Sequence, residues 1–201
     1  DEAFENALKN IFIGMREYEI RAEFEYQLIK RGFDGFVYPS VVLSGERSSF
    51  PISFTSNNVF KENDVLQIDL SPIHRGVGLH MARVVFSSLT DEIENAWRIY
   101  NKSFNIIEDL LKPGTLSSRI DERIRSYLSE KGFQYFHYTG FPLYNFSKPY
   151  IYPDSGDSLE RDMIFVISPG LYVKNKYGFR VKRSVRIKDH SFETLDKFGT
   201  E

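Results

Sequence analysis

Two residues near the middle of the chain have the types and spacing of an acid–base or metal-binding pair. Asp69 lies inside the apolar run Val65–Leu70, where a carboxylate is costly unless a partner compensates its charge. His80 follows eleven residues later, directly before a second apolar run, Met81–Phe86. An imidazole next to a carboxylate can exchange protons or hold a divalent ion. A hydrogen-bonded histidine of the core explains the same pattern more simply, so both interpretations stay open.

The elements that must position this pair follow an α+β order. The two apolar runs are predicted to be neighbouring strands, because Ser71-Pro72 and Gly76–Gly78 place turns between them. Apolar residues at helical spacing predict helices at residues 1–13, 17–31, 90–111 and 118–131. Short β-rich segments predict further strands at Val37–Leu43, Phe50–Phe54, Ile164–Ile167, Leu171–Val173 and Phe179–Ile187. This repeated order indicates two similar halves of one domain, residues 1–201.

The composition limits the class of protein. The 201 residues are 41% hydrophobic with a net charge of −2, which favours one large domain and gives no argument for a nucleic-acid or membrane partner. Because there is no cysteine, disulfides, thiolate catalysis and cysteine-based zinc sites are excluded. No apolar run approaches the roughly 20 residues of a membrane-spanning helix, and the acidic N-terminus lacks a signal-peptide core. We therefore expect a cytoplasmic protein.

Other chemistry has little support in the sequence. No G-x-S-x-G, Walker or G-x-G-x-x-G motif occurs, so a serine hydrolase or a phosphate-binding loop is not expected. Lys174 to Lys188 form a basic run without an intervening acid, which is a weak hint of an anionic ligand. Alternation along strands sends neighbouring side chains to opposite faces, so a solvated strand pair explains the run more simply. Nucleic acid is therefore not an expected partner.

Seven short segments, in order along the whole chain, carry a resemblance to a known family. The chain resembles the M24 metallopeptidases, which include methionine aminopeptidases, Xaa-Pro dipeptidases and creatinase. The segments are GMREYEI at 14–20, GERSSFPI at 45–52, VLQIDLSPIHRGVGLHMARVVF at 65–86, LKPG at 111–114, HYTGFPL at 137–143, MIFVISPGLY at 163–172 and GFRVKRSVRI at 178–187. The resemblance implies the pita-bread fold, an α+β architecture with a curved sheet and two pseudo-symmetric halves.

The departures from this family fall on the residues that hold metal. The resemblance implies two divalent ions held by two aspartates, one histidine and two glutamates. The corresponding positions in this sequence are Asp69, His80, Phe141, Ser168 and Lys182. An auxiliary substrate-binding histidine of the family corresponds to Ile52, and the resemblance also places His137, Tyr144 and Arg180 along the substrate cleft.

These replacements predict a site without a resident cofactor. Two dications require several anionic oxygen ligands, and only Asp69 supplies a carboxylate here. Lys182 brings a positive charge and, while protonated, has no lone pair for a metal. We expect the Lys182 ammonium to replace the metal as the counter-charge of Asp69, the alternative being that Lys182 faces solvent. Phe141 and Tyr144 are expected to fill the former metal pocket with apolar bulk.

The sequence therefore predicts a catalytically inactive peptidase homologue that keeps its cleft as a peptide- or protein-binding surface. The first alternative is an Xaa-Pro dipeptidase or aminopeptidase that uses one weakly bound divalent ion, such as Mn or Co, on Asp69 and His80. A further alternative is a metal-free acid–base hydrolase of creatinase type, with its histidine sought near Phe141 or His137. A homodimer is compatible with each of these readings.

Overall fold

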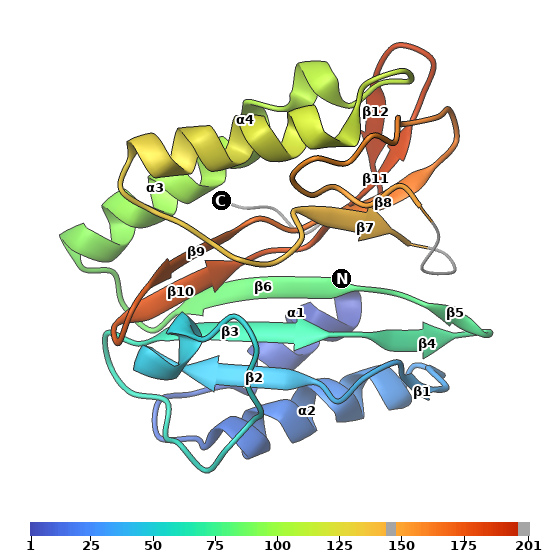
Figure 1. Ribbon diagram of the computed structural model, residues 1–201. Coiled ribbons are helices and arrows are strands. Elements are labelled where there is room, and N and C mark those ends of the chain that lie inside the picture. The colour runs from blue at the N-terminus through green and yellow to red at the C-terminus, as the bar shows by residue number, and fades with distance from the viewer. Residues whose placement is uncertain (144–147, 197–201) are drawn as a thin grey trace. The chain divides into compact units, whose positions relative to one another are not determined.

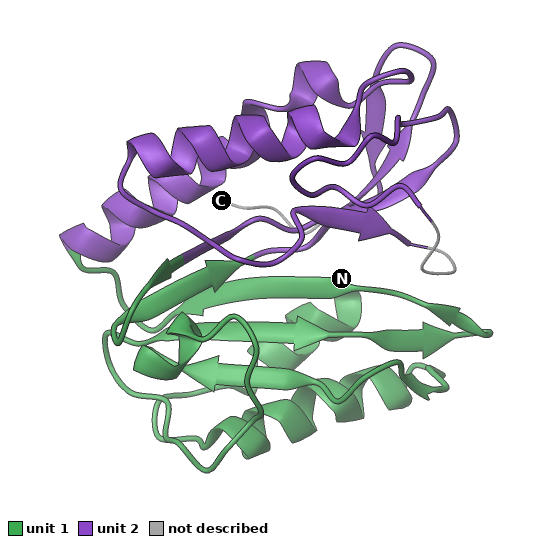
Figure 2. Ribbon diagram, viewed as in Figure 1, with its two compact units in different colours: residues 1–90, 172–180 green, residues 91–171, 181–201 purple. Residues whose placement is uncertain are grey.

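The computed structural model describes residues 1–143 and 148–196, and it divides the chain into two compact units (Figure 2). Unit 1 comprises residues 1–90 and 172–180, and unit 2 comprises residues 91–171 and 181–201. The chain therefore returns to unit 1 for a short segment before it ends in unit 2. Among the helices that the structure describes, none is long and apolar enough to cross a membrane.

The centre of unit 1 is an antiparallel sheet in the order β2-β3-β6 (Figure 1). Its strands are β2 (Val41–Ser44), β3 (Val65–Leu70) and β6 (Met81–Phe86), and its helices are α1 (Glu2–Leu8) and α2 (Glu17–Ile29). Every residue of β3 is buried, which fits its position as the central strand. The register pairs Asp69 with Val41 on one side and with Ala82 on the other. Asp69 and Gln67 therefore share one face of the sheet, opposite to Leu66 and Ile68.

Smaller elements complete unit 1. A second antiparallel sheet, in the order β1-β4-β5, contains β1 (Gly35–Phe36), β4 (Pro72–His74) and β5 (Val77–Gly78). The 3₁₀ turn η1 (Gly45–Ser49) packs against β10 (Tyr177–Arg180). A side chain at Gly178 would overlap the carbonyl group of Ser48, so this close approach requires a glycine. The contact fixes β10, and with it Arg180, within unit 1.

Unit 2 combines two helices with an antiparallel sheet in the order β12-β11-β8-β7. Its elements are α3 (Asp91–Asn105), η2 (Glu108–Leu110), α4 (Ser117–Glu130), β7 (Gly140–Pro142), β8 (Ile164–Ile167), β11 (Arg183–Ile187) and β12 (Phe192–Thr194). The strand β9 (Gly170–Val173) leads from this unit into unit 1 and pairs with β10. The core of unit 2 contains Tyr100, Ile120, Ile124, Leu128 and Phe165.

Several predicted elements differ from the observed ones. The segment Phe50–Phe54 is not a strand, although its apolar residues alternate. Pro51 cannot donate a ladder hydrogen bond, and the side chains of Ile52 and Phe54 are exposed rather than packed. The first helix ends at Leu8 instead of residue 13, and the helix predicted to reach residue 111 ends at Asn105.

The predicted strand Phe179–Ile187 is two strands with a break at Val181 and Lys182. The backbone N–H of Val181 donates to the hydroxyl of Tyr100 at 2.7 Å rather than to a neighbouring strand. The same hydroxyl donates to the carbonyl oxygen of Pro169 at 3.0 Å. Tyr100 on α3 therefore holds two chain segments together where the sheet of unit 2 ends.

Candidate functional site

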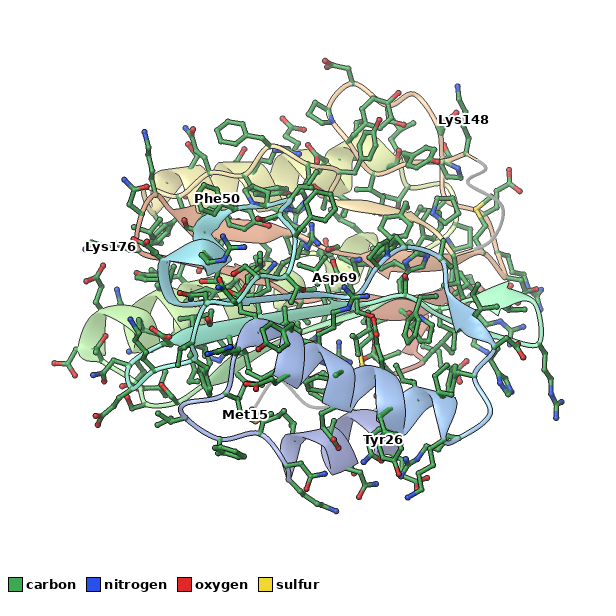
Figure 3. The ribbon with its side chains drawn as sticks, turned by 90° about the horizontal axis from the view of Figure 1, so that it is seen from below. Met15, Tyr26, Phe50, Asp69, Lys148 and Lys176 are labelled. Atoms are coloured by element: carbon green, nitrogen blue, oxygen red, sulfur yellow. The ribbon has the colours of Figure 1, made fainter. Side chains whose placement is uncertain are left out.

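Asp69 is the buried acid of the predicted site, and it has partners from its own unit. Its side chain is only 1% exposed, and Figure 3 shows it among the strands. One carboxylate oxygen, Oδ1, accepts a hydrogen bond from the hydroxyl of Tyr38 at 3.0 Å. The other oxygen, Oδ2, accepts from the guanidinium of Arg180 in an ion pair. Both oxygens of the carboxylate are thus engaged by donors of the chain itself.

His80 reaches this acid through a tyrosine. The Nδ1 atom of His80 lies 3.3 Å from the hydroxyl of Tyr38, and the two rings are stacked at 5.8 Å between centroids. Because Tyr38 also donates to Asp69, the tyrosine hydroxyl links the imidazole and the carboxylate. The predicted proximity of Asp69 and His80 is therefore observed, with a phenol connecting them.

Arg180 joins the buried acid to an exposed apolar loop. Its second terminal nitrogen donates to the carbonyl oxygen of Pro51 at 3.0 Å, between the exposed side chains of Phe50 and Ile52. Burial disfavours the charge of Arg180, but the carboxylate of Asp69 outweighs that effect and raises the guanidinium pKa above its ordinary value. The arginine is therefore a permanent cation beside Asp69.

Two tyrosines near this ion pair are neutral at physiological pH. Burial raises the pKa of Tyr172 to about 12, although Arg180 acts in the opposite direction. Burial and the charge of Asp69 also raise the pKa of Tyr38 far above its ordinary value. Tyr38 therefore keeps its proton and remains a hydrogen-bond donor to the carboxylate.

The remaining predicted positions lie together in unit 2. Ser168 and Lys182 are buried, with 3% and 6% of their surfaces exposed. The ammonium of Lys182 lies 6.0 Å from the centre of the Phe141 ring, at the limit of a cation–π contact. The backbone N–H of Ser168 donates to the carbonyl oxygen of Thr139 at 2.7 Å, which fixes it beside the strand that carries Phe141.

The residues predicted to line the substrate cleft have different surroundings. Ile52 is 85% exposed, in the loop that Arg180 holds through Pro51. The Nδ1 atom of His137 lies 2.9 Å from the carbonyl oxygen of Tyr138, and its ring contacts Tyr135. Tyr144 lies outside the described residues, so the prediction for it stays as stated. The ion pair predicted between Asp69 and Lys182 also stays a prediction, while Arg180 is an observed cation on Asp69.

Comparison with known proteins identifies the family. A sequence model of metallopeptidase family M24 matches residues 1–190, nearly the entire chain. The chain belongs to family M24. It is 27% identical, over 98% of its length, to an uncharacterized peptidase of Methanocaldococcus jannaschii. It is 24% identical, over its whole length, to an Xaa-Pro dipeptidase of Pyrococcus furiosus.

Solved M24 structures confirm the predicted pita-bread fold. The chain matches an X-Pro aminopeptidase from Thermotoga maritima with a TM-score of 0.93 and 27% identity, over 100% of this chain. It matches a prolidase from Pyrococcus furiosus with a TM-score of 0.92 and 23% identity, over 98% of this chain. The chain spans 58% of the length of the aminopeptidase and 59% of the Pyrococcus furiosus dipeptidase sequence.

The side chains do not fit the pair of metal ions that the M24 resemblance implies. Within residues 1–143 and 148–196, no group of three or more His, Cys, Asp or Glu side chains could hold an ion. Asp69 supplies one carboxylate, with Arg180 already paired to it. Phe141 offers no donor atom, and a protonated Lys182 offers no lone pair. This donor set lacks the anionic oxygens that two dications require.

Two further buried acids, Glu17 and Asp121, make structural contacts within their own units. Glu17 at the start of α2 accepts the backbone N–H groups of Ser44 and Ser56, each at 2.8 Å, and pairs with Arg47 at 3.1 Å. Asp121 on α4 pairs with Arg125 at 2.7 Å and accepts from the hydroxyl of Thr139. The M24-like segment GMREYEI contains Glu17. Nothing in the sequence, however, distinguishes an acid with a structural role from an acid with a catalytic role.

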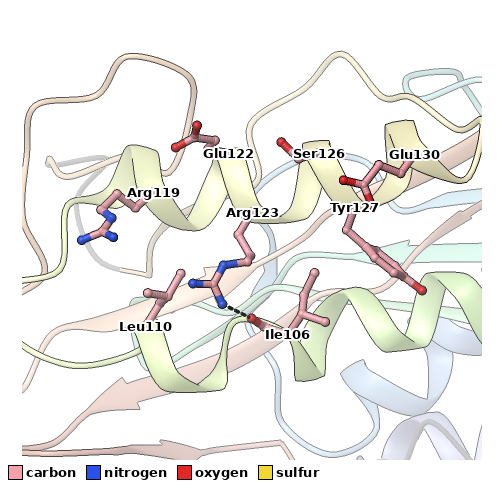
Figure 4. Close-up of a pocket in the computed structure, with 8 residues that line it drawn as sticks. All are labelled: Ile106, Leu110, Arg119, Glu122, Arg123, Ser126, Tyr127 and Glu130. Carbon is pink, nitrogen blue, oxygen red and sulfur yellow. Dashed lines mark hydrogen bonds between the residues drawn. The ribbon is translucent and has the colours of Figure 1, made fainter.

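A surface groove on unit 2 contains none of the predicted site residues. It has a volume of about 510 Å³ and runs between the end of α3 and α4 (Figure 4). Arg123 crosses it and donates to the carbonyl oxygen of Ile106 at 3.1 Å. Arg119, Glu122 and Glu130 give the groove both signs of charge, so its charges favour no single class of ligand.

Proposed function

We propose that this M24 protein binds peptides or proteins without hydrolysing them. The observation that supports this proposal most strongly is the ion pair between Asp69 and Arg180. A metallopeptidase uses such a carboxylate to hold a divalent ion, which polarises the scissile carbonyl and activates water. Here the chain's own guanidinium takes the charge-balancing role, and the M24 resemblance places His80, Ser168 and Lys182 at the positions of the other acidic ligands.

An exposed apolar loop next to this ion pair supports a binding role. Phe50, Ile52 and Phe54 are 48%, 85% and 78% exposed, on a segment without regular secondary structure. Arg180 fixes the loop at the carbonyl of Pro51, so these side chains project from an anchored backbone. Grouped exposed apolar side chains commonly mark a site for a peptide or protein partner. The auxiliary histidine of the family is replaced here by Ile52, which exchanges a polar contact for an apolar one.

Hydrolysis and binding can be measured on the same preparation. The purified chain is incubated with Ala-Pro and with Gly-Pro, in added Mn²⁺ or Co²⁺, while its metal content is determined. We expect no turnover above the buffer control and no stoichiometric metal. Turnover that depends on added metal would overturn the proposal and favour the one-ion dipeptidase that Asp69 and His80 could support.

Peptide binding by the exposed loop is tested with a substitution at Ile52. Substitution Ile52→Ser in the anchored loop is expected to weaken binding of a fluorescent Xaa-Pro peptide about tenfold, since one exposed anchor is lost. The matched control is Ile13→Ser, because Ile13 is also exposed, at 53%, on an irregular segment of unit 1. Equal losses in the two variants, or no binding by the unmodified chain, would remove the support for this surface.

A further inference from the structure

Helix α4 of unit 2 carries six charged side chains, which fall into two groups. Arg125 pairs with Asp121 at 2.7 Å, and Arg123 pairs with Asp109 at 3.3 Å. The other three are exposed and form no ion pair within residues 1–143 and 148–196: Arg119, Glu122 and Glu130. This second group has charges of both signs and is available to a partner.

The spacing along α4 explains why these three charges do not neutralise one another. Opposite charges pair on a helix surface when they are three or four residues apart. The residue four positions after Arg119 is another arginine, and the residue four positions before Glu130 is a serine. Glu122 has the right spacing from Arg119, but the two side chains point in different directions (Figure 4). Because eleven residues make about three turns, Arg119 and Glu130 lie on one face, positive at its start and negative at its end.

We infer that α4 pairs with α4 of a second copy of this chain, in antiparallel orientation about a two-fold axis. With the axis at the midpoint of residues 119–130, Arg119 of each copy lies beside Glu130 of the other, since contacts across a two-fold axis are reciprocal. Glu122 lies within about 1.5 Å of the level of Ser126 of the second copy, whose hydroxyl can donate to the carboxylate. A parallel pair would bring Arg119 beside Arg119, so charge selects the antiparallel arrangement.

The arginine near the centre of this face does not oppose the pairing. Arg123 is directed toward the end of α3, where it donates to the carbonyl oxygen of Ile106 at 3.1 Å and pairs with Asp109 (Figure 4). Its charge is therefore balanced within its own copy. The side chain of Leu116, directly before the helix, is 41% exposed and adds apolar surface at each end of the pair. An interface limited to one helix face and rich in charge predicts a weak, reversible dimer.

The exposed face of the neighbouring helix α3 does not have this complementarity. It borders a second groove, of about 730 Å³, whose lining includes Trp97, Arg98 and Lys102. An antiparallel pair of α3 about the midpoint of residues 94–105 would bring Arg98 of one copy next to Lys102 of the other. Because these like charges repel, charge favours α4 and not α3 as the interface.

The association state of the full chain tests the inference directly. Sedimentation velocity is expected to show a monomer–dimer equilibrium with a dissociation constant on the order of 10 µM, at the weak end for protein interfaces. Raising NaCl from about 0.05 M to about 0.5 M should raise that constant about tenfold, because salt screens exposed ion pairs. A chain that stays monomeric at about 500 µM contradicts the inference.

Charge reversal identifies the face that pairs. Arg119→Glu places two carboxylates together at both ends of the helix pair, and Glu130→Arg places two guanidinium groups there. Each variant is expected to raise the dissociation constant about tenfold, because the two-fold axis repeats the contact and one substitution changes two ion pairs. An equal mixture of the two variants restores both attractive contacts, so heterodimers should form as readily as dimers of the unmodified chain.

A matched control and a double variant complete the test. Arg98→Glu reverses an exposed arginine of the same unit, on α3, and is expected to leave the dissociation constant unchanged. The double variant Arg119→Glu with Glu130→Arg restores the ion pairs within one kind of chain, and it gives the same test if a single variant does not fold. Dimers that persist in both single variants, or a mixture that stays monomeric, would overturn the assignment to α4.

This inference is independent of the proposed function. The face of α4 belongs to unit 2, whereas the exposed loop proposed to bind peptides belongs to unit 1. Hydrolysis of Ala-Pro with Mn²⁺ would overturn the proposed function and leave the dimer standing. Loss of the dimer would leave peptide binding by the loop untouched.

Discussion

Unit 1 contains two buried carboxylates that each meet an arginine, yet their surroundings differ in kind. Glu17 is fully buried and accepts from two backbone N–H groups, the Ser56 hydroxyl and Arg47. Asp69 is nearly as buried, and it accepts from the side chains of Tyr38 and Arg180. Burial and a cationic partner are therefore common to a scaffold acid and to an acid at the predicted site.

The type of donor distinguishes the two acids. Substitution of a side chain does not remove a backbone N–H group. The hydrogen bonds from Ser44 and Ser56 to Glu17 therefore depend on the backbone conformation. Side-chain donors can be replaced one at a time, which allows the surroundings of Asp69 to change while the sheet remains.

The largest expected effect concerns Glu17. Replacing it with alanine leaves buried backbone donors and Arg47 without their acceptor, which we expect to destabilise the fold by about 4 kcal/mol. Glu25 on the same helix is a matched control, because it makes a partly exposed pair with Arg21 at 2.8 Å. Glu25→Ala should cost only about 0.5 kcal/mol in urea-induced unfolding. Similar losses for the two variants would show that Glu17 does not fasten the scaffold.

A double-substitution cycle sharpens the contrast between the two acids. Arg180→Met leaves the Asp69 charge buried and is expected to cost about 3 kcal/mol. Adding Asp69→Asn removes that charge, so the double variant should recover most of the loss. The corresponding pair Glu17→Ala with Arg47→Ala should show no recovery, because the backbone donors of Ser44 and Ser56 remain unpaired. Equal recovery in both cycles would contradict the distinction by donor type.

A smaller effect follows from the tyrosines near Asp69. The pKa of Tyr172 is raised by burial from its ordinary 10.0 to about 12. In the unfolded chain the phenol ionises first, so its contribution to stability is fully present below pH 10 and is lost as pH rises toward 12. Tyr172→Phe should make the fall of stability over that range less steep in urea unfolding. An unchanged slope would show that Tyr172 does not titrate in this way.

The sequence predicts the scaffold well where periodicity and local motifs decide the structure. The strands Val65–Leu70 and Met81–Phe86 are observed within the predicted bounds. The break between β10 and β11 could not be predicted, because it depends on a hydrogen bond from Val181 to Tyr100, 81 residues apart. The segment Phe50–Phe54 has the alternation of a strand but has no partner strand, which a local pattern does not reveal.

Some of the residues predicted for the site lie close together in the structure, but the sequence did not reveal all their contacts. The M24 resemblance directed attention to Asp69, His80 and Arg180, and these three residues lie around one hydrogen-bond network. It gave no role to Tyr38, which joins His80 to Asp69, because no spacing rule relates residues that are brought together by separate strands. The cation expected on Asp69 was Lys182, whereas the chain also brings Arg180 to it from β10.

We expect the protein's own Arg180, and not divalent ions, to balance the charge of Asp69. Titration of Mn²⁺ into the purified chain at pH 7, followed by calorimetry, measures this directly. We predict no saturable binding, with any dissociation constant weaker than about 1 mM. Two ions bound per chain at micromolar concentration would contradict it.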